Sequence, residues 1–363
     1  MDRIARRREA LRARLAEKKL DALLVVHPTN VAYLTGFSGD SSYLLVGPRR
    51  DLILSDGRFT TQIEQECPGL EAHIRPTGRT MNQAVVEVVK KLDVHRLGFE
   101  ASRLSVADWD FLTRELASRE LVAADGHVEA LRCVKDDAEI AAIREAIDQA
   151  QRAFLKLRGE LVAGETEKAV ADRLEALLRE FGATGSSFPP IVAVGRRAAL
   201  PHARPTTKTR IGDDDFVLFD WGADGREYKS DLTRMVVTGK VTPDFAKVYR
   251  IVLTAQERAI AAIRPGAKAQ DIDAEARSYI DQAGFGRFFE HGLGHGIGLD
   301  IHEGPRLRKE SSTILEPGMV VTVEPGIYLP EWGGVRIEDD VLVTPDGREV
   351  LSSLPKSLDS VTL

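Results

Sequence analysis

The sequence has few cysteines, no long hydrophobic run and no excess of positive charge. Its two cysteines, Cys67 and Cys133, fit neither a disulfide framework nor a metal-binding spacing, so we expect free thiols in a reducing compartment. No apolar stretch approaches the roughly 18 residues that a membrane-spanning helix needs. The net charge of −6 favours neither nucleic acid nor an anionic membrane as a partner. These absences predict a cytoplasmic protein that binds neither.

The arginine-rich start of the chain does not continue as a targeting signal. The apolar stretch Ala22–Val26 is too short for the hydrophobic part of a signal peptide, and Glu9 and Glu17 argue against a transit peptide. We expect a solvated first helix with an apolar stripe that includes Leu11 and Leu15.

The length of 363 residues suffices for two domains. Short apolar runs predict strands at 22–26, 43–46 and 52–54, and helices are expected at 83–92 and 106–116, so the first part is predicted to be an α/β domain. A long helix should begin near Asp136, because Asp136 and Glu139 have the spacing of a capping box. We therefore predict two domains, residues 1–133 and 134–363.

The second domain contains an internal repeat. Gly164 and Gly182 bracket one expected helix, and Gly266 and Gly284 bracket another with the same separation. Apolar positions of the two helices match at a single offset of 102 residues, and each closing glycine stands where a helix end often needs positive φ. This pattern predicts a pseudo-twofold pair of α+β units with the functional cleft between them.

Five potential metal ligands follow one another in this domain: Asp220, Asp231, His295, Glu324 and Glu338. Four carboxylates and one imidazole form an oxygen-rich set, which suits two hard divalent cations better than one tetrahedral zinc ion. Two such cations, roughly 3.5–4 Å apart, can activate water and polarise a carbonyl group. The set therefore indicates a hydrolase.

A hairpin is expected to bring the two aspartates together. Val217–Phe219 predicts a strand that ends at Asp220, and the return strand would begin at Asp231 after a turn at Asp224-Gly225. Asp231 would then lie opposite Leu218, as a diagonal neighbour of Asp220 on one face. The alternative is that both are solvated turn residues, which suits Asp224 but not Asp220, since Asp220 follows three apolar residues.

The remaining candidate ligands follow strands or lie in glycine-rich chain. The segment 291–298 has too many glycines for a helix, and in an extended chain His291 and His295 share a face. Glu324 ends an apolar run, and Arg336 and Glu338 share a face of the next strand. Arg336 could instead form an ion pair with a glutamate at a sheet edge, and His202, between Pro201 and Pro205, could be an unrelated loop histidine.

These segments resemble the metal-site blocks of the "pita-bread" metallopeptidases. The matching blocks are Phe219-Asp-Trp-Gly, Ser230-Asp-Leu-Thr-Arg, His291-Gly-Leu-Gly-His-Gly-Ile-Gly, Val323-Glu-Pro-Gly and Val335-Arg-Ile-Glu-Asp. Within this family the chain is similar to the Xaa-Pro peptidases, aminopeptidase P and prolidase. The segment that begins at Asn30 resembles the creatinase/prolidase N-terminal domain. The resemblance implies a pita-bread catalytic domain at 134–363, a homodimer and a proline-containing peptide as substrate.

The resemblance also implies a role for each matching residue. Asp220 would hold one metal ion, His295 and Glu324 the other, and Asp231 and Glu338 would bridge them. Histidines that line the substrate site are matched by His202, His291 and His302, of which we expect His202 and His302 to act in catalysis. Arg336 and Phe188 match substrate-site positions, Phe188 with an apolar packing role as the alternative. Mn²⁺ is our first choice of metal, then Co²⁺, with Zn²⁺ as a third.

The implied reaction is hydrolysis of an Xaa-Pro peptide bond, by a dipeptidase or an aminopeptidase. A hydroxide that bridges the metals would attack the carbonyl before proline, Glu324 would carry the proton to the leaving nitrogen, and His302 would stabilise the oxyanion. Methionine aminopeptidases share the ligand order but typically lack this N-terminal domain, and creatinases do not keep the metal ligands. A catalytically silent binding scaffold of this fold is the other alternative, although none of the five ligands is missing here.

Overall fold

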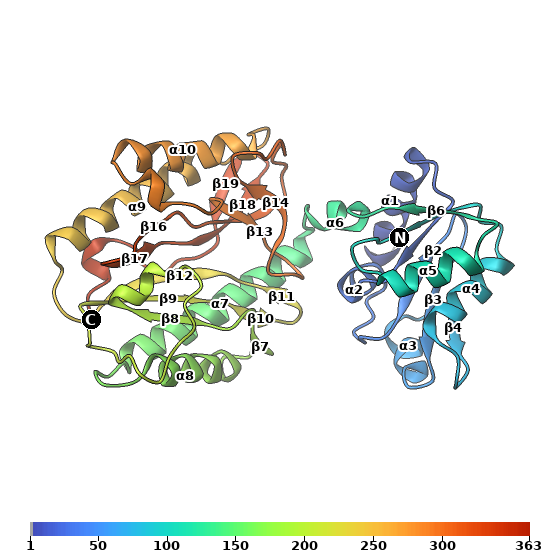
Figure 1. Cartoon of the computed structure of the whole chain (residues 1–363), viewed down its shortest axis with the longest axis horizontal. Coiled ribbons are helices and arrows are strands. Elements are labelled where there is room, and N and C mark those ends of the chain that lie inside the picture. The colour runs from blue at the N-terminus through green and yellow to red at the C-terminus, as the bar shows by residue number, and fades with distance from the viewer. Residues whose placement is uncertain (1–2) are drawn as a thin grey trace. The chain divides into compact units, whose positions relative to one another are not determined.

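The computed structural model describes residues 3–363, and the chain divides into two compact units between Arg132 and Cys133. Figure 1 shows the first unit in blue to cyan and the second in green to red. Each unit has its own hydrophobic core. Among the described residues, no helix has the length and apolar character needed to cross a membrane.

The first unit is an α/β domain with one six-stranded sheet, as the sequence predicts. Its six strands have the order β4-β3-β2-β1-β5-β6, with antiparallel pairing of β1 to β2 and of β2 to β3 and parallel pairing elsewhere. Leu11 and Leu15 of the first helix are buried. The elements are α1 (Arg3–Glu17), β1 (Ala22–Val25), α2 (Pro28–Thr35), β2 (Tyr43–Val46), β3 (Asp51–Asp56), α3 (Thr60–Glu66), β4 (Glu71–Arg75), α4 (Met81–Lys91), β5 (Arg96–Phe99), α5 (Val106–Glu115), β6 (Glu120–Ala123) and α6 (His127–Arg132).

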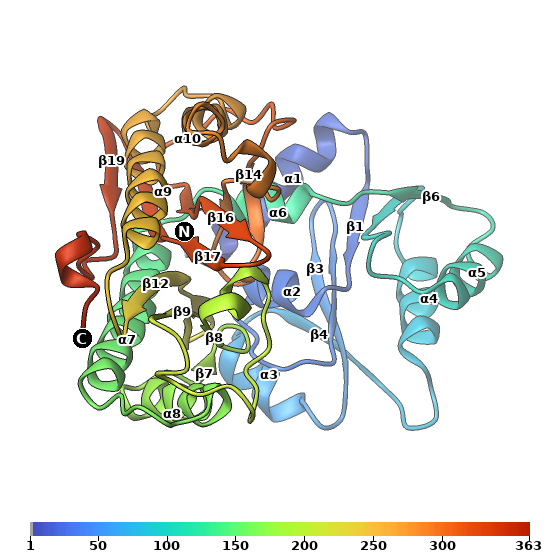
Figure 2. The same ribbon diagram turned by 60° about the vertical axis from the view of Figure 1, so that its left-hand side comes forward.

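The second unit places strands between two pairs of helices. In Figure 2, α10, the β16–β17 ribbon, the β12-β9-β8 sheet and α8 follow one another from top to bottom. Its first half contains α7 (Asp137–Gly159), α8 (Glu167–Glu180), β7 (Gly185–Ser186), β8 (Ile191–Val194), η1 (Gly195–Ala199), β9 (Phe216–Trp221), β10 (Ala223–Gly225), β11 (Tyr228–Lys229) and β12 (Leu232–Val237).

The second half of this unit contains α9 (Pro243–Ala262), α10 (Ala269–Gln282), η2 (Gly286–Phe288), β13 (Gly294–Gly296), β14 (Glu303–Leu307), β15 (Val320–Val323), β16 (Gly326–Leu329), β17 (Gly333–Arg336), β18 (Asp339–Thr344), β19 (Gly347–Val350) and η3 (Leu358–Ser360). Its five-stranded sheet has the order β14-β13-β15-β18-β19. The apolar faces of α9 and α10 pack in one core with β15 and β18, whereas α7 and α8 pack in another with β8 and β9.

The predicted helix start and the predicted repeat are both confirmed. Asp136 caps α7 and forms the capping box with Glu139. The closing glycines of the repeat, Gly182 and Gly284, follow α8 and α10 with φ of 101° and 86°. The opening glycines also correspond, because the amide of Gly164 donates to Ile211 at 2.8 Å and that of Gly266 to Leu315 at 2.9 Å. The two halves of the unit therefore repeat one backbone pattern.

The predicted turn at Asp224-Gly225 is wrong by two residues. Gly225 pairs with Tyr228, so the turn consists of Arg226 and Glu227, both with positive φ. Position 225 requires glycine for a different reason. A Cβ there would lie 3.1 Å from the Cα of Ala146 in α7. The close approach of a helix, rather than turn chemistry, accounts for this glycine. Asp224 accordingly lies in β10 and not in a solvated turn. Its Oδ2 forms an ion pair with the Nζ of Lys229 at 2.6 Å.

The register of β9 and β12 moves with the turn. Leu218 pairs with Met235, so it does not lie opposite Asp231, as the predicted turn requires. The partner of Leu218 moves by four residues, from 231 to 235, and because four is even every side chain keeps its predicted face. The prediction that Asp220 and Asp231 share one face is therefore correct, although the predicted turn is wrong.

Candidate metal centre and substrate pocket

One pocket in the second unit is lined by every site residue that the sequence predicts. Its volume is about 610 Å³, and it is partly open to solvent. The predicted residues in its lining are Phe188, His202, Asp220, Asp231, His291, His295, His302, Glu324, Arg336 and Glu338. The chain therefore brings together side chains that are up to 150 positions apart in sequence.

Strand pairing positions the two aspartates. Asp220 lies near the end of β9 and pairs directly with Thr233 of β12. Asp231 precedes Thr233 by two residues, so it shares the face of Thr233 and lies diagonal to Asp220. Both carboxylates are buried, with 8% and 6% of the residue exposed.

The second half of the unit supplies the other three candidate ligands. His295 is the central residue of β13, Glu324 directly follows β15, and Glu338 lies between β17 and β18. Because Val323 pairs with Asp339, continuation of this register places Glu324 and Glu338 opposite each other at one end of the strands. Each half of the repeat therefore contributes two carboxylates to the pocket.

His295 contacts carboxylates from both halves. Its Nε2 lies 3.6 Å from Oδ2 of Asp231 and 3.3 Å from Oε1 of Glu324. Ligand atoms of Asp231, His295 and Glu338 all lie within 4.8 Å of one another. The Nδ1 of His295 is 3.1 Å from the carbonyl oxygen of Gly296, which can only accept, so Nδ1 carries a proton. Nε2 is therefore the ring atom that faces the two carboxylates, and it can offer a lone pair to a bound cation.

The buried carboxylates of the pocket repel one another, so a positive charge between them would be stabilising. Burial, followed by the charges of neighbouring carboxylates, raises the pKa of Asp231 and of Glu338 well above the ordinary values. Burial also raises the pKa of Asp220. For Glu324, burial acts in the same direction, but the hydrogen bond and the charge of His295 outweigh it and lower the pKa to about 2.

Two carboxylate oxygens in the pocket have no internal partner. Oδ1 of Asp220 and Oε1 of Glu338 are buried and receive no hydrogen bond from any residue in 3–363. A buried acceptor without a partner is costly unless an ion or water satisfies it. Unpaired oxygens, an imidazole lone pair and mutually repelling carboxylates together form a donor set that fits divalent cations.

Arg336 pairs with Asp220, so the sequence-based alternative of an ion pair with a glutamate is wrong. The Nη2 of Arg336 bonds to Oδ2 of Asp220, while its Nε donates to Thr233 at 3.0 Å and its Nη1 to Tyr328 at 2.8 Å. The guanidinium group is buried. It neutralises one oxygen of Asp220 and leaves the other available.

Thr233 and Tyr328 are site residues that the sequence-based reasoning missed. The hydroxyl of Thr233 donates to Oε2 of Glu338 at 2.7 Å, and that of Tyr328 lies 2.9 Å from Nε2 of His291. The position of Thr233, two residues after Asp231 on a strand, gave a usable signal. Tyr328 gave none, because its partners are set by the pairing of β16 with β17.

The three predicted substrate-site histidines differ in surroundings. His291 has both ring nitrogens engaged, by Gly292 at 2.8 Å and by Tyr328. His302 packs edge-on against His295, with ring centroids 4.4 Å apart, and burial together with the positive charge of His295 and Arg306 lowers its pKa to about 4. His202 is exposed in the loop between Pro201 and Pro205. Only His302 and His202 have ring nitrogens open to a substrate in this arrangement.

Comparison with known families gives two matches along the chain. Residues 141–345 match metallopeptidase family M24, and residues 7–134 match the creatinase/prolidase N-terminal domain. Together the matches cover most of both units. All five candidate metal ligands lie within the first of these ranges.

Similar proteins and structures include both kinds of Xaa-Pro peptidase. The Xaa-Pro dipeptidase of Pyrococcus furiosus is 35% identical over 94% of this chain and 96% of its own length. The structure of an Xaa-Pro dipeptidase from Bacillus anthracis superimposes with a TM-score of 0.94, at 37% identity, over 99% of this chain and all of the other. An X-Pro aminopeptidase from Thermotoga maritima gives a TM-score of 0.86 at 35% identity, over 95% and 99% of the two chains.

Proposed function

The chain belongs to metallopeptidase family M24, and we propose that it is an Xaa-Pro dipeptidase that holds two divalent cations in this pocket. The observation that carries the proposal is the convergence of four carboxylates and His295, contributed by both halves of the repeat, on one cavity. Hydrolysis of a peptide bond is the chemistry for which such an oxygen-rich centre is suited.

The proposed distribution of the metal ligands is the one that the resemblance to the pita-bread metallopeptidases implies. Asp220 would hold one cation through Oδ1, His295 and Glu324 would hold the other, and Asp231 and Glu338 would lie between them. Bound cations would lower the pKa of a water molecule and polarise the substrate carbonyl. Mn²⁺ is our first choice among divalent ions, followed by Co²⁺ and Zn²⁺, because oxygen ligands predominate.

The chain's own residues would handle the proton and the developing negative charge. Glu324, whose carboxylate lines the cavity, would accept a proton from water and deliver it to the proline nitrogen. With a pKa of about 4, His302 is neutral and can donate an N–H to the oxyanion, assisted by His202. The proline nitrogen would leave as an amine, so it needs this proton when the bond to the carbonyl carbon breaks.

Two arginines in the pocket favour a dipeptide as substrate. Arg306 and Arg308, at the end of β14, line the same cavity as the metal ligands. In a dipeptide the free carboxylate lies one residue from the cleaved bond, whereas a longer peptide has a neutral amide there. A guanidinium group pairs well with a carboxylate, while the wall near Phe188 offers apolar contact to the pyrrolidine ring.

The test of substrate class compares Ala-Pro with an Arg-Pro-Pro peptide, each with Mn²⁺. We expect rapid cleavage of Ala-Pro and poor cleavage of the longer peptide. Efficient removal of the first residue from the longer peptide would favour the second candidate, an Xaa-Pro aminopeptidase, to which the resemblance of the Thermotoga maritima enzyme points. Cleavage of neither peptide by protein loaded with Mn²⁺ or Co²⁺ would contradict the proposal.

A variant of Arg306 separates the two candidates further. Arg306→Met should raise KM for Ala-Pro by about 10-fold or more, since a hydrogen bond to a charged group contributes roughly 1.5–3 kcal/mol. The longer peptide should show little change. Steady-state kinetics with both substrates measure the effect, and Arg287→Met, outside the pocket lining, is the control. Equal losses for the two peptides would argue against carboxylate recognition.

Three further expectations belong to this proposal. The functional domains would span residues 1–133 and 134–363, the working form would be a homodimer, and the protein would act in the cytoplasm. Sedimentation of the purified chain tests the second of these, and a monomer at micromolar concentration would exclude it.

A further inference from the structure

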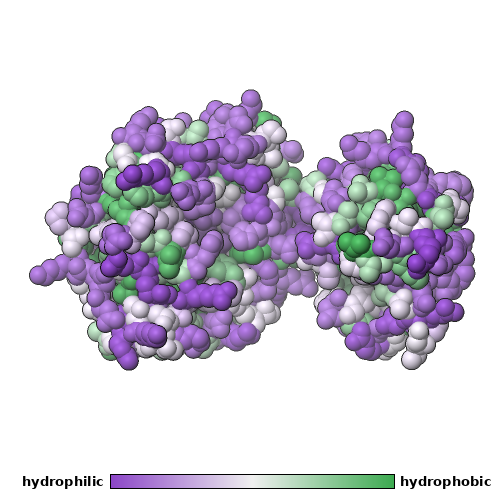
Figure 3. Space-filling model, viewed as in Figure 1, coloured by the Kyte–Doolittle hydropathy of each residue, from purple (hydrophilic) through white to green (hydrophobic). Residues whose placement is uncertain are grey.

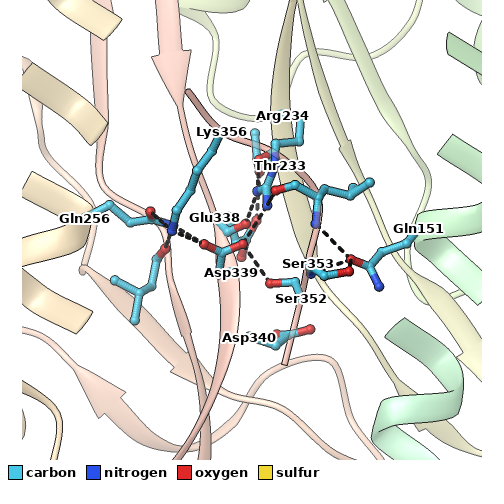
Figure 4. Close-up of polar contacts among 12 residues, drawn as sticks. Gln151, Thr233, Arg234, Gln256, Glu338, Asp339, Asp340, Ser352, Ser353 and Lys356 are labelled. Carbon is cyan, nitrogen blue, oxygen red and sulfur yellow. Dashed lines mark hydrogen bonds and ion pairs between the residues drawn. The ribbon is translucent and has the colours of Figure 1, made fainter. Parts of the chain in front are cut away.

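A polar network surrounds Asp339, the residue that follows the candidate metal ligand Glu338 (Figure 4). Glu338 stands in the break between β17 and β18, so its carbonyl oxygen has no partner in a strand ladder. Nη1 of Arg234 donates to that carbonyl and, at 3.0 Å, to the carbonyl of Thr233. One buried guanidinium therefore holds the backbone of a metal ligand and of the threonine that bonds its side chain.

Arg234 is in turn held by Asp339. Only 2% of Arg234 and 1% of Asp339 are exposed, and Nη2 of the arginine lies 2.6 Å from Oδ1 of the aspartate. Asp339 follows Glu338 directly, so strand alternation turns it away from the pocket. A buried charge pair requires further hydrogen bonds to offset its desolvation.

The segment after β19 supplies most of those bonds. Ser352 donates to Oδ1 of Asp339 at 2.7 Å, and the Nζ of Lys356 donates to Oδ2. Gln256 of α9 adds a bond to Oδ2 at 3.0 Å, and the carbonyl of Leu354 accepts from Arg234 at 3.0 Å. Residues 352–356 therefore reach the metal ligand through an unbroken chain of contacts, from Lys356 to Asp339, to Arg234 and to the backbone of Glu338.

We propose that Arg234 and Asp339 are positioning residues for Glu338, and that residues 352–356 maintain the affinity of the pocket for divalent cations through them. The inference rests on the proposed metal site. Groups that orient metal ligands without touching the metal typically change affinity or activity by 10- to 100-fold when they are replaced. A buried ion pair that served the fold alone would affect stability and leave metal affinity unchanged.

The experiment measures Mn²⁺ dissociation constants by calorimetry on the full-length chain after removal of metal. Lys356→Met and Asp339→Asn should each weaken Mn²⁺ binding by about 10- to 100-fold. Lys356→Arg keeps a cation beside Asp339 and should restore most of the affinity. Substitution of Lys356 should disturb the fold less, because its side chain is 24% exposed. The Lys356 variants therefore test the proposal even where Asp339→Asn fails to fold.

Two control variants remove hydrogen bonds to the chain after β19 without touching Asp339. Tyr249→Phe removes a hydrogen bond of 3.0 Å to the carbonyl of Lys356, and Arg158→Met removes one of 2.7 Å to the carbonyl of Thr362. Both should bind Mn²⁺ like the parent, even where their melting temperatures fall. Far-UV circular dichroism of each metal-free variant establishes that it is folded.

The outcomes separate this inference from the proposed function. Parent protein that binds no divalent cation would overturn both. Parent that binds Mn²⁺, with folded Lys356→Met of equal affinity, would overturn the inference alone. Control variants that lose as much affinity as Lys356→Met would also overturn it, since the segment would then act only through overall stability.

Discussion

The buried carboxylates of the pocket lower the stability of the metal-free fold, because each lies near other negative charges. Asp231 and Glu338 are buried beside each other's charge, and no residue in 3–363 donates to Oε1 of Glu338. A core that served folding alone would not hold four carboxylates in one cavity, because burial of unpaired charge is costly. The cost is offset when a cation binds, so metal affinity and stability are linked at these positions.

Replacement of one bridging candidate should therefore have opposite effects on function and on stability. Asp231→Asn should abolish turnover and lower metal content, because one charged ligand is lost from the centre. The metal-free variant should melt no lower than the parent, since a repulsive charge is removed. Metal analysis, peptide hydrolysis and thermal melting measure these effects.

The control for this variant is Asp224→Asn on the neighbouring strand. Asp224 pairs with Lys229 and does not line the pocket, so the control should keep both metal and activity. Normal turnover in Asp231→Asn would contradict the assigned role.

A histidine in the first unit should make that unit sensitive to acid. Burial, with the nearby charges of Arg14 and Lys18, lowers the pKa of His127 below 6.5. As pH falls through 6.5, the unfolded chain takes up the proton first, so the free energy of unfolding decreases. His127→Gln should lose less stability than the parent between about pH 8 and about pH 5.5.

Denaturant unfolding at several pH values measures this difference. His95→Gln, at a side chain that is 70% exposed, is the control and should follow the parent. A parent and a His127→Gln variant with parallel pH profiles would exclude the effect.

At the scale of elements, the repeat depends on glycines that end helices. Gly284 has φ of 86° after α10, and a Cβ there would have no neighbour within 4 Å. Gly284→Ala should therefore lower the free energy of unfolding by about 1–2 kcal/mol through backbone strain alone. Gly159, the last residue of α7, also has open space but lacks positive φ.

Gly159→Ala is the matched control for that substitution. Alanine is the better helix former, so this variant should be neutral or more stable by about 0.5 kcal/mol. Urea unfolding of both variants measures the difference. Similar losses in the two would show that the end of α10 does not require a left-handed residue.

Much of this element structure could be predicted, and the one wrong turn shows why the rest could not. Apolar runs and the capping box at Asp136 located strands and the start of α7, because both depend on neighbours in sequence. Gly225 misled the turn prediction because its constraint comes from Ala146, far away along the chain. The carboxylates of the site could be found in sequence since each ends or begins a strand, but the partner of Arg336 depends on register.

At the scale of the whole molecule, the candidate metal site belongs to one of the two compact units. Every candidate metal ligand lies in the second unit, and polar side chains cover most of the face that this unit presents in Figure 3. Added Mn²⁺ should therefore stabilise the second unit selectively. At about 100 times the dissociation constant, the gain would be roughly 2.7 kcal/mol.

Hydrogen exchange followed by mass spectrometry tests this selectivity. Mn²⁺ should slow exchange in β9, β12, β15 and β18, and EDTA should reverse the effect. Peptides from β1 and β5 in the first unit serve as the internal control and should be unchanged. Uniform slowing in both units would indicate that the metal acts on the protein in general.

The division of ligands between the two halves of the repeat has a consequence for synthesis. A ribosome releases Asp220 and Asp231 first, yet neither can assemble a working centre before Glu324 and Glu338 have emerged more than 90 residues later. A nascent chain that ends before Glu324 therefore lacks two of the five candidate ligands. Metal binding at the proposed centre therefore has to wait until both halves of the repeat have been synthesised.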